Sequence, residues 1–198
     1  PIAMFAALEA GLTVVNLNPL EKKATLHHEL NDSGAKAVVV LDHCAAELSQ
    51  ALSGTNVAHV IVTQVGDGLP AIKAGITQCY LRYIKRVIPP YSWKGVAQHR
   101  FKAMLAYRSQ TTFVRPSYHP QDLAYIQYTS ATTGPAKGVM LTHHNILSNI
   151  AQAKAWVGTD KLGPHEIIVT ALPLYHIFSL TANCWVYLSI GATNHLIP

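Results

Sequence analysis

Short apolar runs rich in β-branched residues recur along the chain and alternate with segments that carry apolar residues at helical spacing. In the first third of the chain, the apolar runs lie at residues 12–17, 37–41 and 59–63. The helix-like segments lie at residues 2–10, 26–30 and 44–52. Apolar runs of this kind are typical of strands buried on both faces, and their alternation with helices predicts a parallel, doubly wound sheet.

The same alternation resumes after Pro120. We expect strands at residues 123–129, 166–171 and 192–197, and helices at residues 143–157 and 178–188. The predicted fold class is therefore α/β, with mostly parallel sheets flanked by helices. We expect one domain built from an α/β segment (1–66), a basic, loop-rich connection (67–121) and a second α/β segment (122–198). Both ends break into apolar segments, so we expect them to be cuts through a longer protein.

Residues 167–192 contain no Asp, Glu, Lys or Arg. This uncharged stretch is long enough to be a candidate membrane-spanning helix. Pro173, His176, Thr181 and Asn183 interrupt the stretch, and it begins with the strand-like Ile167–Thr170. A buried strand, a turn and a buried helix explain it better.

The positive charge is concentrated in one part of the chain. No Asp or Glu lies between Gly68 and Gln121, whereas nine of the fifteen Lys and Arg residues do. These are Lys73, Arg82, Lys85, Arg86, Lys94, Arg100, Lys102, Arg108 and Arg115. A surface of one sign attracts phosphate-rich partners such as nucleic acid, anionic lipid or a polyanionic cofactor.

Residues 80–88 mix aromatic, aliphatic and basic side chains, as segments at a membrane surface do. The alternative is a solvated helix face with extended Lys and Arg side chains, and both interpretations stay open. The three cysteines, Cys44, Cys79 and Cys184, are far apart and form no CxxC pair, so we expect neither a disulfide framework nor a zinc site. A reducing, cytoplasmic setting fits this best.

The stretch most informative about chemistry is residues 128–138, YTSATTGPAKG, called the phosphate segment below. It reads as a strand that ends in hydroxyl residues, followed by a glycine turn, a lysine and a helix. Hydroxyl groups and backbone N–H groups hold phosphate oxygens, and the lysine adds a positive charge. The segment matches neither the Walker A spacing nor the GxGxxG dinucleotide turn, and an ordinary polar β–α loop is the alternative.

The phosphate segment resembles YTSGTTGxPKG, the signature of adenylate-forming (AMP-binding) enzymes, and residues 139–145 resemble its GVMLTHxN continuation. Residues 171–178 resemble the LPLYHIF block of the fatty-acyl branch. Residues 15–20 and 30–35 look like the NPL and LNDSGA segments of bacterial long-chain fatty-acid–CoA ligases. The resemblance runs along nearly the whole chain.

The resemblance implies a two-step reaction, in which ATP activates a fatty acid to acyl-AMP with release of pyrophosphate, and coenzyme A then displaces AMP. Catalysis of this kind depends on cations and donors aimed at the charge that develops on phosphate. By matching position, the resemblance assigns phosphate contacts to Tyr128, Thr129, Ser130, Ala131, Thr132, Thr133, Gly134, Lys137 and Gly138. It also makes Thr129 a contact of Mg²⁺, which ATP oxygens would otherwise hold.

The resemblance also places His176 near the acyl carboxylate, as a catalytic residue that orients the substrate through a hydrogen bond, with Tyr175 and Phe178 shaping an apolar wall. Without the resemblance, a satisfied core histidine is the simpler interpretation. His143 and His144 begin a predicted helix and are candidates for anion binding, although capping and surface roles explain them as well. The remaining histidines lack metal-ligand spacing.

Two residues depart from the signature: Ala131 replaces a glycine, which puts the phosphate affinity in doubt, and Ala136 replaces a proline. The family's adenine and ribose contacts, its acidic Mg²⁺ residue and its C-terminal lid domain have no match within the chain, so we expect residues 1–198 alone not to complete adenylation. Two alternatives remain: an acyl-AMP ligase acting on another acid or a carrier protein, and a basic module that binds membrane or nucleic acid. Nucleic-acid binding leaves the phosphate segment unexplained, and we do not expect it. The substrates implied are fatty acid, ATP and coenzyme A, and peripheral membrane association is a further hypothesis.

Overall fold

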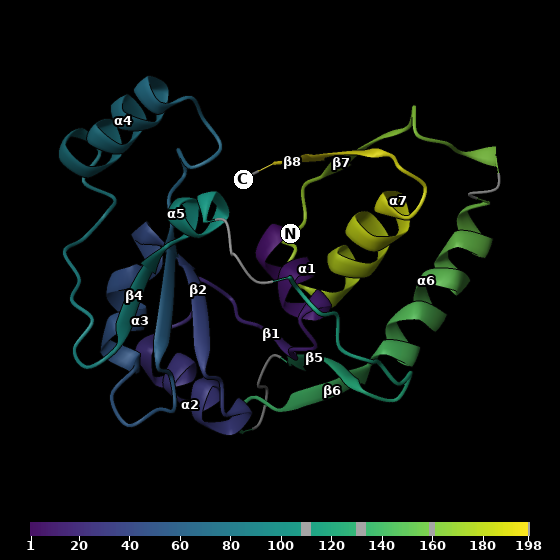
Figure 1. Ribbon diagram of the computed structural model, residues 1–198, viewed down its shortest axis with the longest axis horizontal. Coiled ribbons are helices and arrows are strands. Elements are labelled where there is room, and N and C mark those ends of the chain that lie inside the picture. The colour runs from purple at the N-terminus through teal and green to yellow at the C-terminus, as the bar shows by residue number, and fades with distance from the viewer. Residues whose placement is uncertain (108–111, 130–133, 159–160, 198) are drawn as a thin grey trace. The chain divides into compact units, whose positions relative to one another are not determined.

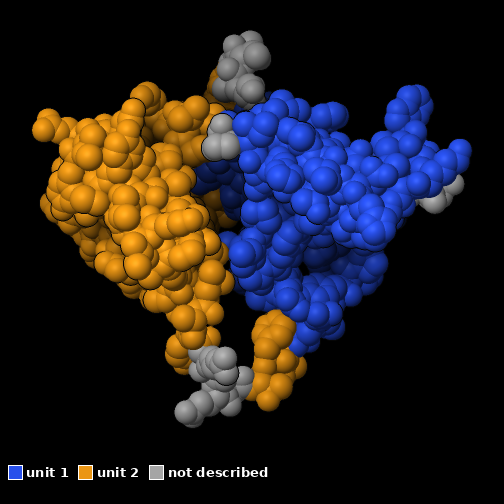
Figure 2. Space-filling view, turned by 90° about the horizontal axis from the view of Figure 1, so that it is seen from above, with its two compact units in different colours: residues 1–17, 115–130, 137–198 blue, residues 18–114, 131–136 orange. Residues whose placement is uncertain are grey.

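The computed structural model describes residues 1–107, 112–129, 134–158 and 161–197 and divides the chain into two compact units (Figures 1 and 2). Unit 1 comprises residues 1–17, 115–130 and 137–198, and unit 2 comprises residues 18–114 and 131–136. Each unit contains helices and mainly parallel strands, which confirms the predicted α/β class.

The sheet at the centre of the candidate site lies in unit 1 and has the order β1-β5-β6. Strand β1 (Val14–Asn16) pairs in parallel with β5 (Leu123–Tyr128), so that Val14 lies opposite Tyr125 and Asn16 opposite Gln127. We expected β1 to share one parallel sheet with the next two strands of the sequence. That prediction was wrong: β1 pairs with a strand that follows it by more than 100 residues.

The phosphate segment connects two antiparallel strands. Strand β6 (Gly138–Thr142) runs back along β5, with Gly138 opposite Tyr128 and Met140 opposite Ile126. The sequence predicted a helix at residues 143–157 after the lysine, which is confirmed, but it did not predict the five-residue strand that comes first. Helix α6 (His143–Val157) begins only after Thr142, whose side chain accepts a hydrogen bond from the amide of Asn145 in a capping box.

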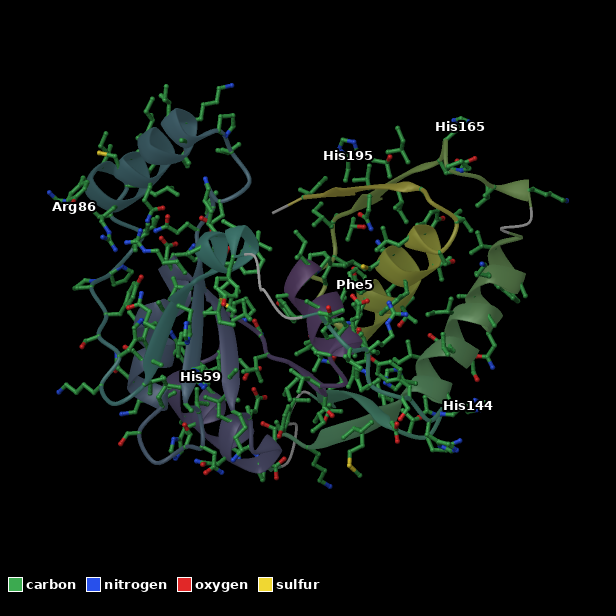
Figure 3. The ribbon with its side chains drawn as sticks, viewed as in Figure 1. Phe5, His59, Arg86, His144, His165 and His195 are labelled. Carbon is green, nitrogen blue, oxygen red and sulfur yellow. The ribbon has the colours of Figure 1, made fainter. Side chains whose placement is uncertain are left out.

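The core of unit 1 lies between this sheet and the helices that cover it. Helix α1 (Ile2–Glu9), α6 and a continuous helical run formed by the π-helix η4 (Ser179–Trp185) and α7 (Val186–Leu188) contribute to it. Its buried side chains are Leu8, Ala124, Tyr125, Ile146, Ile150, Leu180, Cys184 and Val186. Phe5, labelled in Figure 3, packs edge-on against Trp185 with ring centroids 4.7 Å apart.

Strand β7 (Ile167–Thr170) and strand β8 (Thr193–Leu196) form a separate parallel pair in unit 1. The uncharged stretch between residues 167 and 192 is thus a strand followed by a helix, as expected. Among the described residues, no helix combines the length and the apolar character needed to cross a bilayer.

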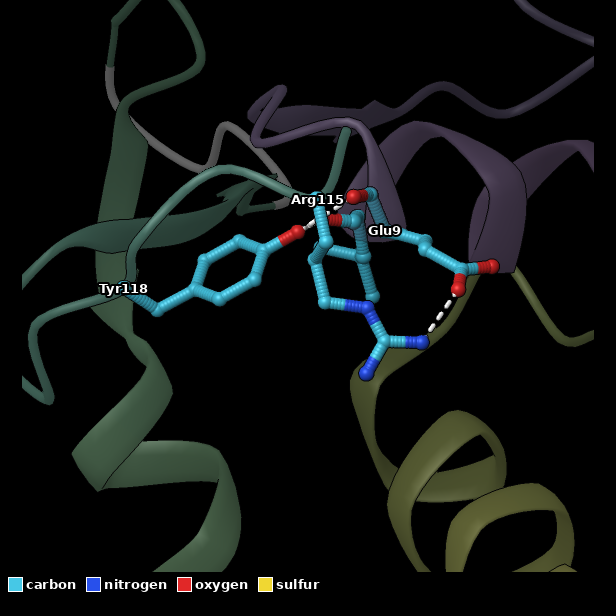
Figure 4. Close-up of polar contacts among 4 residues, drawn as sticks. Glu9, Arg115 and Tyr118 are labelled. Atoms are coloured by element: carbon cyan, nitrogen blue, oxygen red, sulfur yellow. Dashed lines mark hydrogen bonds and ion pairs between the residues drawn. The ribbon is translucent and has the colours of Figure 1, made fainter. Parts of the chain in front are cut away.

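Helix α1 is attached to the segment that leads into β5 (Figure 4). The guanidinium of Arg115 forms an ion pair with the carboxylate of Glu9 at 2.5 Å, and the Tyr118 hydroxyl donates to the main-chain oxygens of Leu8 and Glu9. Exposed ion pairs contribute little to stability, so the hydrogen bonds to the helix end are the more important part of this contact. They fix where the chain enters β5.

Unit 2 is built on the all-parallel sheet β2-β3-β4. Strands β2 (Ala37–Leu41) and β3 (His59–Thr63) are the predicted apolar runs. Helix α2 (Lys23–Ser33) precedes them and ends at Gly34, which has φ +65° and serves as a left-handed cap. The 3₁₀ helix η1 (Asp42–Cys44) and helix α3 (Ala45–Ala51) follow β2.

The basic region has more regular structure than expected. Helix α4 (Ala71–Cys79) continues into the π-helix η2 (Tyr80–Ile84), and Arg86, labelled in Figure 3, takes a left-handed φ of +52° just beyond it. Strand β4 (Ala97–Arg100) pairs with β3 and leads into helix α5 (Phe101–Ala106). We expected a basic, loop-rich connection over residues 67–121. The sequence AQHR of β4 lacks an apolar run because this strand lies at an edge of the sheet.

Candidate active site

The two ends of the phosphate segment are held together by backbone hydrogen bonds. The amide of Thr129 donates to the main-chain oxygen of Lys137 at 3.1 Å, and the Thr129 hydroxyl lies 3.5 Å from the same oxygen. This pairing continues the β5–β6 ladder by one residue. Of the predicted phosphate contacts, Ser130, Ala131, Thr132 and Thr133 lie outside the described residues.

Gly138 is a glycine because the preceding strand packs against it. A Cβ atom at this position would lie 2.8 Å from Cγ2 of Ile126 and 3.2 Å from Cζ of Tyr128. Contacts this short require the strands or the tyrosine ring to move. The partly buried Tyr128 therefore lies against the start of β6, with a structural role beside its predicted one.

The groups proposed to meet phosphate are open to solvent. Lys137, Thr129 and Gly134 are all exposed, and the site of a Cβ on Gly134 has no described atom within 4 Å. A segment with an exposed lysine, an exposed threonine hydroxyl and an exposed glycine suits a large polyanion such as a triphosphate. Among the described residues, no three His, Cys, Asp or Glu side chains gather as metal ligands.

His176 lies in the segment between β7 and η4, and its ring orientation is set locally. The amide of Phe178 donates to Nδ1 of His176 at 3.3 Å, and the His176 amide donates to the main-chain oxygen of Pro173. Because Nδ1 accepts, a neutral ring carries its proton on Nε2. The His176 side chain is exposed, so it is not the satisfied core histidine that the sequence alone favoured. Phe178 is exposed and Tyr175 is half-buried.

A chain of amide side chains connects the two sequence blocks. Gln127 donates from Nε2 to the main-chain oxygen of Tyr175 at 3.0 Å, and Asn16 donates from Nδ2 to Oε1 of Gln127 at 3.3 Å. Gln127 stands two residues before Thr129 on β5, so the His176 block is attached to the strand that enters the phosphate segment. Sequence reasoning missed Gln127 and Asn16; a polar side chain within each apolar strand was the available signal.

A third missed residue is His28 on α2, in unit 2. Its Nε2 lies 3.0 Å from the main-chain oxygen of Ala136, within the phosphate segment. In the sequence it was one of the remaining histidines without metal-ligand spacing, and no local signal marked it for this contact.

The start of α6 does not offer an anion site. The amides of His143 and His144 donate to the main-chain oxygens of Asp122 and Pro120, and the Asn145 amide donates to the Thr142 hydroxyl. Figure 3 labels the exposed His144 at this helix end. Since these N–H groups already have acceptors, capping and packing explain the two histidines.

Two buried groups near these elements have altered proton affinities. Burial raises the pKa of the Tyr125 hydroxyl in β5 to about 12, so this core residue stays neutral. Burial, together with the charge of nearby Glu21, raises the pKa of Glu29 on α2 from its ordinary value of 4.5 to about 8. Glu29 is therefore largely protonated near neutral pH.

Comparison with known proteins shows which family shares these features. Residues 1–198 match the AMP-binding enzyme family. The chain is 44% identical over 197 residues to a long-chain-fatty-acid–CoA ligase of Salmonella typhimurium, and the match covers all of this chain but 35% of that protein. The chain thus spans about a third of the length of the curated relatives it matches.

Solved structures show the same fold. A long-chain-fatty-acid-CoA ligase from Archaeoglobus fulgidus is 27% identical, with a TM-score of 0.65, over 98% of this chain and 32% of that one. An anthranilate CoA ligase in complex with anthranoyl-AMP reaches a TM-score of 0.72 at 18% identity, over 99% and 32% of the two chains. At that identity the second likeness concerns the fold alone.

Proposed function

The chain belongs to the AMP-binding enzyme family, and from that premise we propose that the full-length protein containing it activates a long-chain fatty acid. ATP converts the acid to acyl-AMP with release of pyrophosphate, and coenzyme A then displaces AMP to give acyl-CoA. The long-chain substrate is supported by the naming of the relatives that are 42–45% identical along the chain.

The observation that carries the proposal is the exposed side chain of Lys137 near the end of the phosphate segment. The hydrogen bond between the Thr129 amide and the Lys137 main-chain oxygen holds the two ends of this segment together. A fatty-acid carboxylate and the α-phosphate of ATP repel each other, so the site must offset negative charge. In the proposal, the β- and γ-phosphates are held by Thr129, Gly134, Lys137 and the hydroxyl residues Ser130, Thr132 and Thr133. Thr129 would be the protein contact of the Mg²⁺ ion that accompanies ATP, and the ion would help to offset the phosphate charge.

His176 orients the acyl carboxylate in this proposal. Its local hydrogen bond from Phe178 leaves the Nε2–H group of the neutral ring as the donor toward a carboxylate oxygen. Tyr175 and Phe178 supply apolar surface beside it. Attachment of Tyr175 to β5 through Gln127 supports this assignment, since it connects the acyl block to the strand that enters the phosphate segment.

Residues 1–198 alone would not complete the reaction. In the proposal they form part of one large AMP-binding domain, and the remaining contacts to adenine, ribose and Mg²⁺, together with the lid, come from the other two thirds of a full-length protein. The competing proposal within the same family is an acyl-AMP ligase that acts on another carboxylic acid or delivers to a carrier protein.

Product analysis distinguishes these reactions. The full-length protein is incubated with ATP, Mg²⁺, coenzyme A and, in turn, palmitate, octanoate, acetate and an amino acid. We expect palmitoyl-CoA and equal amounts of AMP and pyrophosphate. Formation of acyl-AMP without acyl-CoA would favour the carrier-protein alternative, and preference for another acid would refute the long-chain assignment. Release of ADP instead of AMP would refute adenylation itself.

We further propose that the protein acts in the cytoplasm and binds peripherally to the inner membrane face through the helical run Ala71–Ile84. Its apolar side chains Ile72, Ile76 and Tyr83 are 80%, 66% and 68% exposed. The exposed Arg82, Lys85 and Arg86 flank them. An amphipathic helix with this composition binds anionic lipid through both apolar and electrostatic contacts.

Charge reversal tests the membrane proposal. The triple variant Arg82→Glu, Lys85→Glu and Arg86→Glu should lose sedimentation with vesicles that contain phosphatidylglycerol, whereas Lys94→Glu, Arg100→Glu and Lys102→Glu together serve as a control of equal charge within unit 2. Unchanged binding of the first variant would refute the proposal. An equal loss in both variants would reduce it to a general effect of net charge.

A further inference from the structure

Two consecutive histidines on α2 each reach a main-chain oxygen within unit 2. Nδ1 of His27 lies 2.9 Å from the oxygen of Ala51, at the end of α3, whereas Nε2 of His28 lies 3.0 Å from the oxygen of Ala136. A carbonyl oxygen can only accept, so the His28 ring carries a hydrogen on Nε2 and donates it. The two side chains thus make the same kind of bond to different parts of the unit.

Ala136 occupies a decisive place in the phosphate segment, because it directly precedes Lys137. Its side chain is half-buried, whereas Gly134 and Pro135 before it and Lys137 after it are exposed. Gly134 offers no side chain to pack, and its surroundings are open. The bond from His28 is therefore an anchor for a stretch of backbone that has little packing of its own.

The peptide groups on both sides of Lys137 are held. Within unit 2, His28 donates to the oxygen of Ala136; within unit 1, the Thr129 amide donates to the oxygen of Lys137. Within unit 2, fixing the Ala136 carbonyl restricts the backbone that leads into Lys137. A lysine that is ordered before its ligand arrives loses less entropy when it binds that ligand.

We infer that His28 is a positioning residue for nucleotide binding: its Nε2–H group holds the Ala136 carbonyl and so keeps the 134–137 backbone in the shape that presents Lys137 to the phosphates of ATP. The inference rests on the proposed function, since it assigns to His28 a task at the same site. His28 does not touch ATP in this account and acts only through the backbone.

The test compares His28→Ala, His28→Gln and the matched control His27→Ala in the full-length protein. Amide hydrogen exchange of the peptide spanning residues 134–138 is measured without nucleotide, and ATP affinity is measured by calorimetry and as KM. We expect faster exchange of this peptide in His28→Ala and about fivefold weaker ATP binding, the effect of losing one hydrogen bond. The KM values for fatty acid and coenzyme A should not change.

The other two variants separate positioning from a general loss of stability. His28→Gln keeps an N–H donor and should recover part of the ATP affinity, whereas His27→Ala should leave both the 134–138 exchange and the ATP affinity as in the wild type. Unchanged exchange in His28→Ala, unchanged ATP affinity, or equal effects in His27→Ala would each overturn the inference. Faster exchange in His28→Ala, with no ATP binding by the wild type, would confirm the anchor and refute the proposed function instead.

Discussion

The side-chain nitrogen of Gln127 lies 3.0 Å from the main-chain oxygen of Tyr175 and donates a hydrogen bond to it. Gln127 stands near the end of β5, and Tyr175 directly precedes His176. One hydrogen bond thus connects the strand that enters the phosphate segment with the block assigned to the fatty acid, although the two are almost 50 residues apart in sequence. Asn16 on β1 holds the oxygen of the same Gln127 side chain.

Replacing Gln127 with leucine should therefore weaken catalysis without disturbing ATP binding. The substitution leaves the Tyr175 oxygen and the Asn16 amide without this partner, and losing one such bond costs about 1 kcal/mol, or about fivefold in kcat/KM for palmitate. Steady-state formation of palmitoyl-CoA measures the effect. Gln152→Leu, at an exposed position on α6, is the matched control; an equal loss there, or none in Gln127→Leu, would contradict the assigned role.

Gly138→Ala should destabilise the β5–β6 pair. The added methyl group would lie 2.8 Å from Ile126 and 3.2 Å from Tyr128, and overpacking of this kind costs about 1–3 kcal/mol. Gly163→Ala provides the control in the same unit, because a Cβ there has no described atom within 4 Å. Thermal unfolding should show a lower midpoint for Gly138→Ala only. Equal unfolding midpoints for the two variants would contradict the prediction, and would show that β5 and β6 move apart enough to accept the methyl group at little cost.

Thr142→Ala should shorten or loosen the start of α6. The threonine hydroxyl accepts from the Asn145 amide, and loss of such a cap costs about 1 kcal/mol. Thr142→Ser keeps the hydroxyl and should retain most of the stability. Urea unfolding of the three proteins measures the difference; a serine variant as unstable as the alanine variant would show that the methyl group, and not the cap, matters.

Glu29 should make stability fall as pH rises. Its carboxyl group has a pKa of about 8 when folded and an ordinary value of 4.5, so between these pH values the folded state keeps a proton that the unfolded state has released. The stabilising contribution is complete below pH 4.5 and is lost as pH rises through 8, with a slope of at most about 1.4 kcal/mol per pH unit.

Glu29→Gln removes this group and should flatten the dependence, giving a variant that is more stable than the wild type near pH 8. Urea unfolding at pH 5, 6, 7 and 8 measures it. Glu9→Gln, which changes an exposed carboxyl group, is the control. A wild-type stability that increases over this range, with the same slope in Glu29→Gln, would show that Glu29 is not the group responsible.

The elements that sequence predicted well are those whose own residues carry a strong local signal. Strands β2 and β3 are continuous apolar runs, and α2 ends at a glycine that takes the left-handed conformation. Two strands, β4 and β6, were not predicted, because their own residues carry a weak local signal. Strand β4 is an exposed edge strand without apolar alternation. Strand β6 was missed because a strand of five residues leaves little periodicity to recognise.

Contacts between distant parts of the sequence were the least predictable features. The pairing of β1 with β5, the bond from Gln127 to Tyr175 and the bond from His28 to Ala136 each join residues separated by about 50 or more positions. Spacing along the chain contains no information about such contacts. The motif residues themselves were recognisable by resemblance, whereas the residues that hold them in place, His28 and Gln127, became visible only in the folded chain.

The most direct test of the account is palmitate-dependent ATP–pyrophosphate exchange by the full-length protein and its Lys137→Ala variant, with Lys161→Ala, another exposed lysine of unit 1, as the control. We predict exchange in the wild type, retention in Lys161→Ala and a fall of about 100-fold in Lys137→Ala, as expected when a charge that stabilises the transition state is removed. Wild-type exchange in Lys137→Ala would contradict the central claim that this lysine binds the phosphates of ATP.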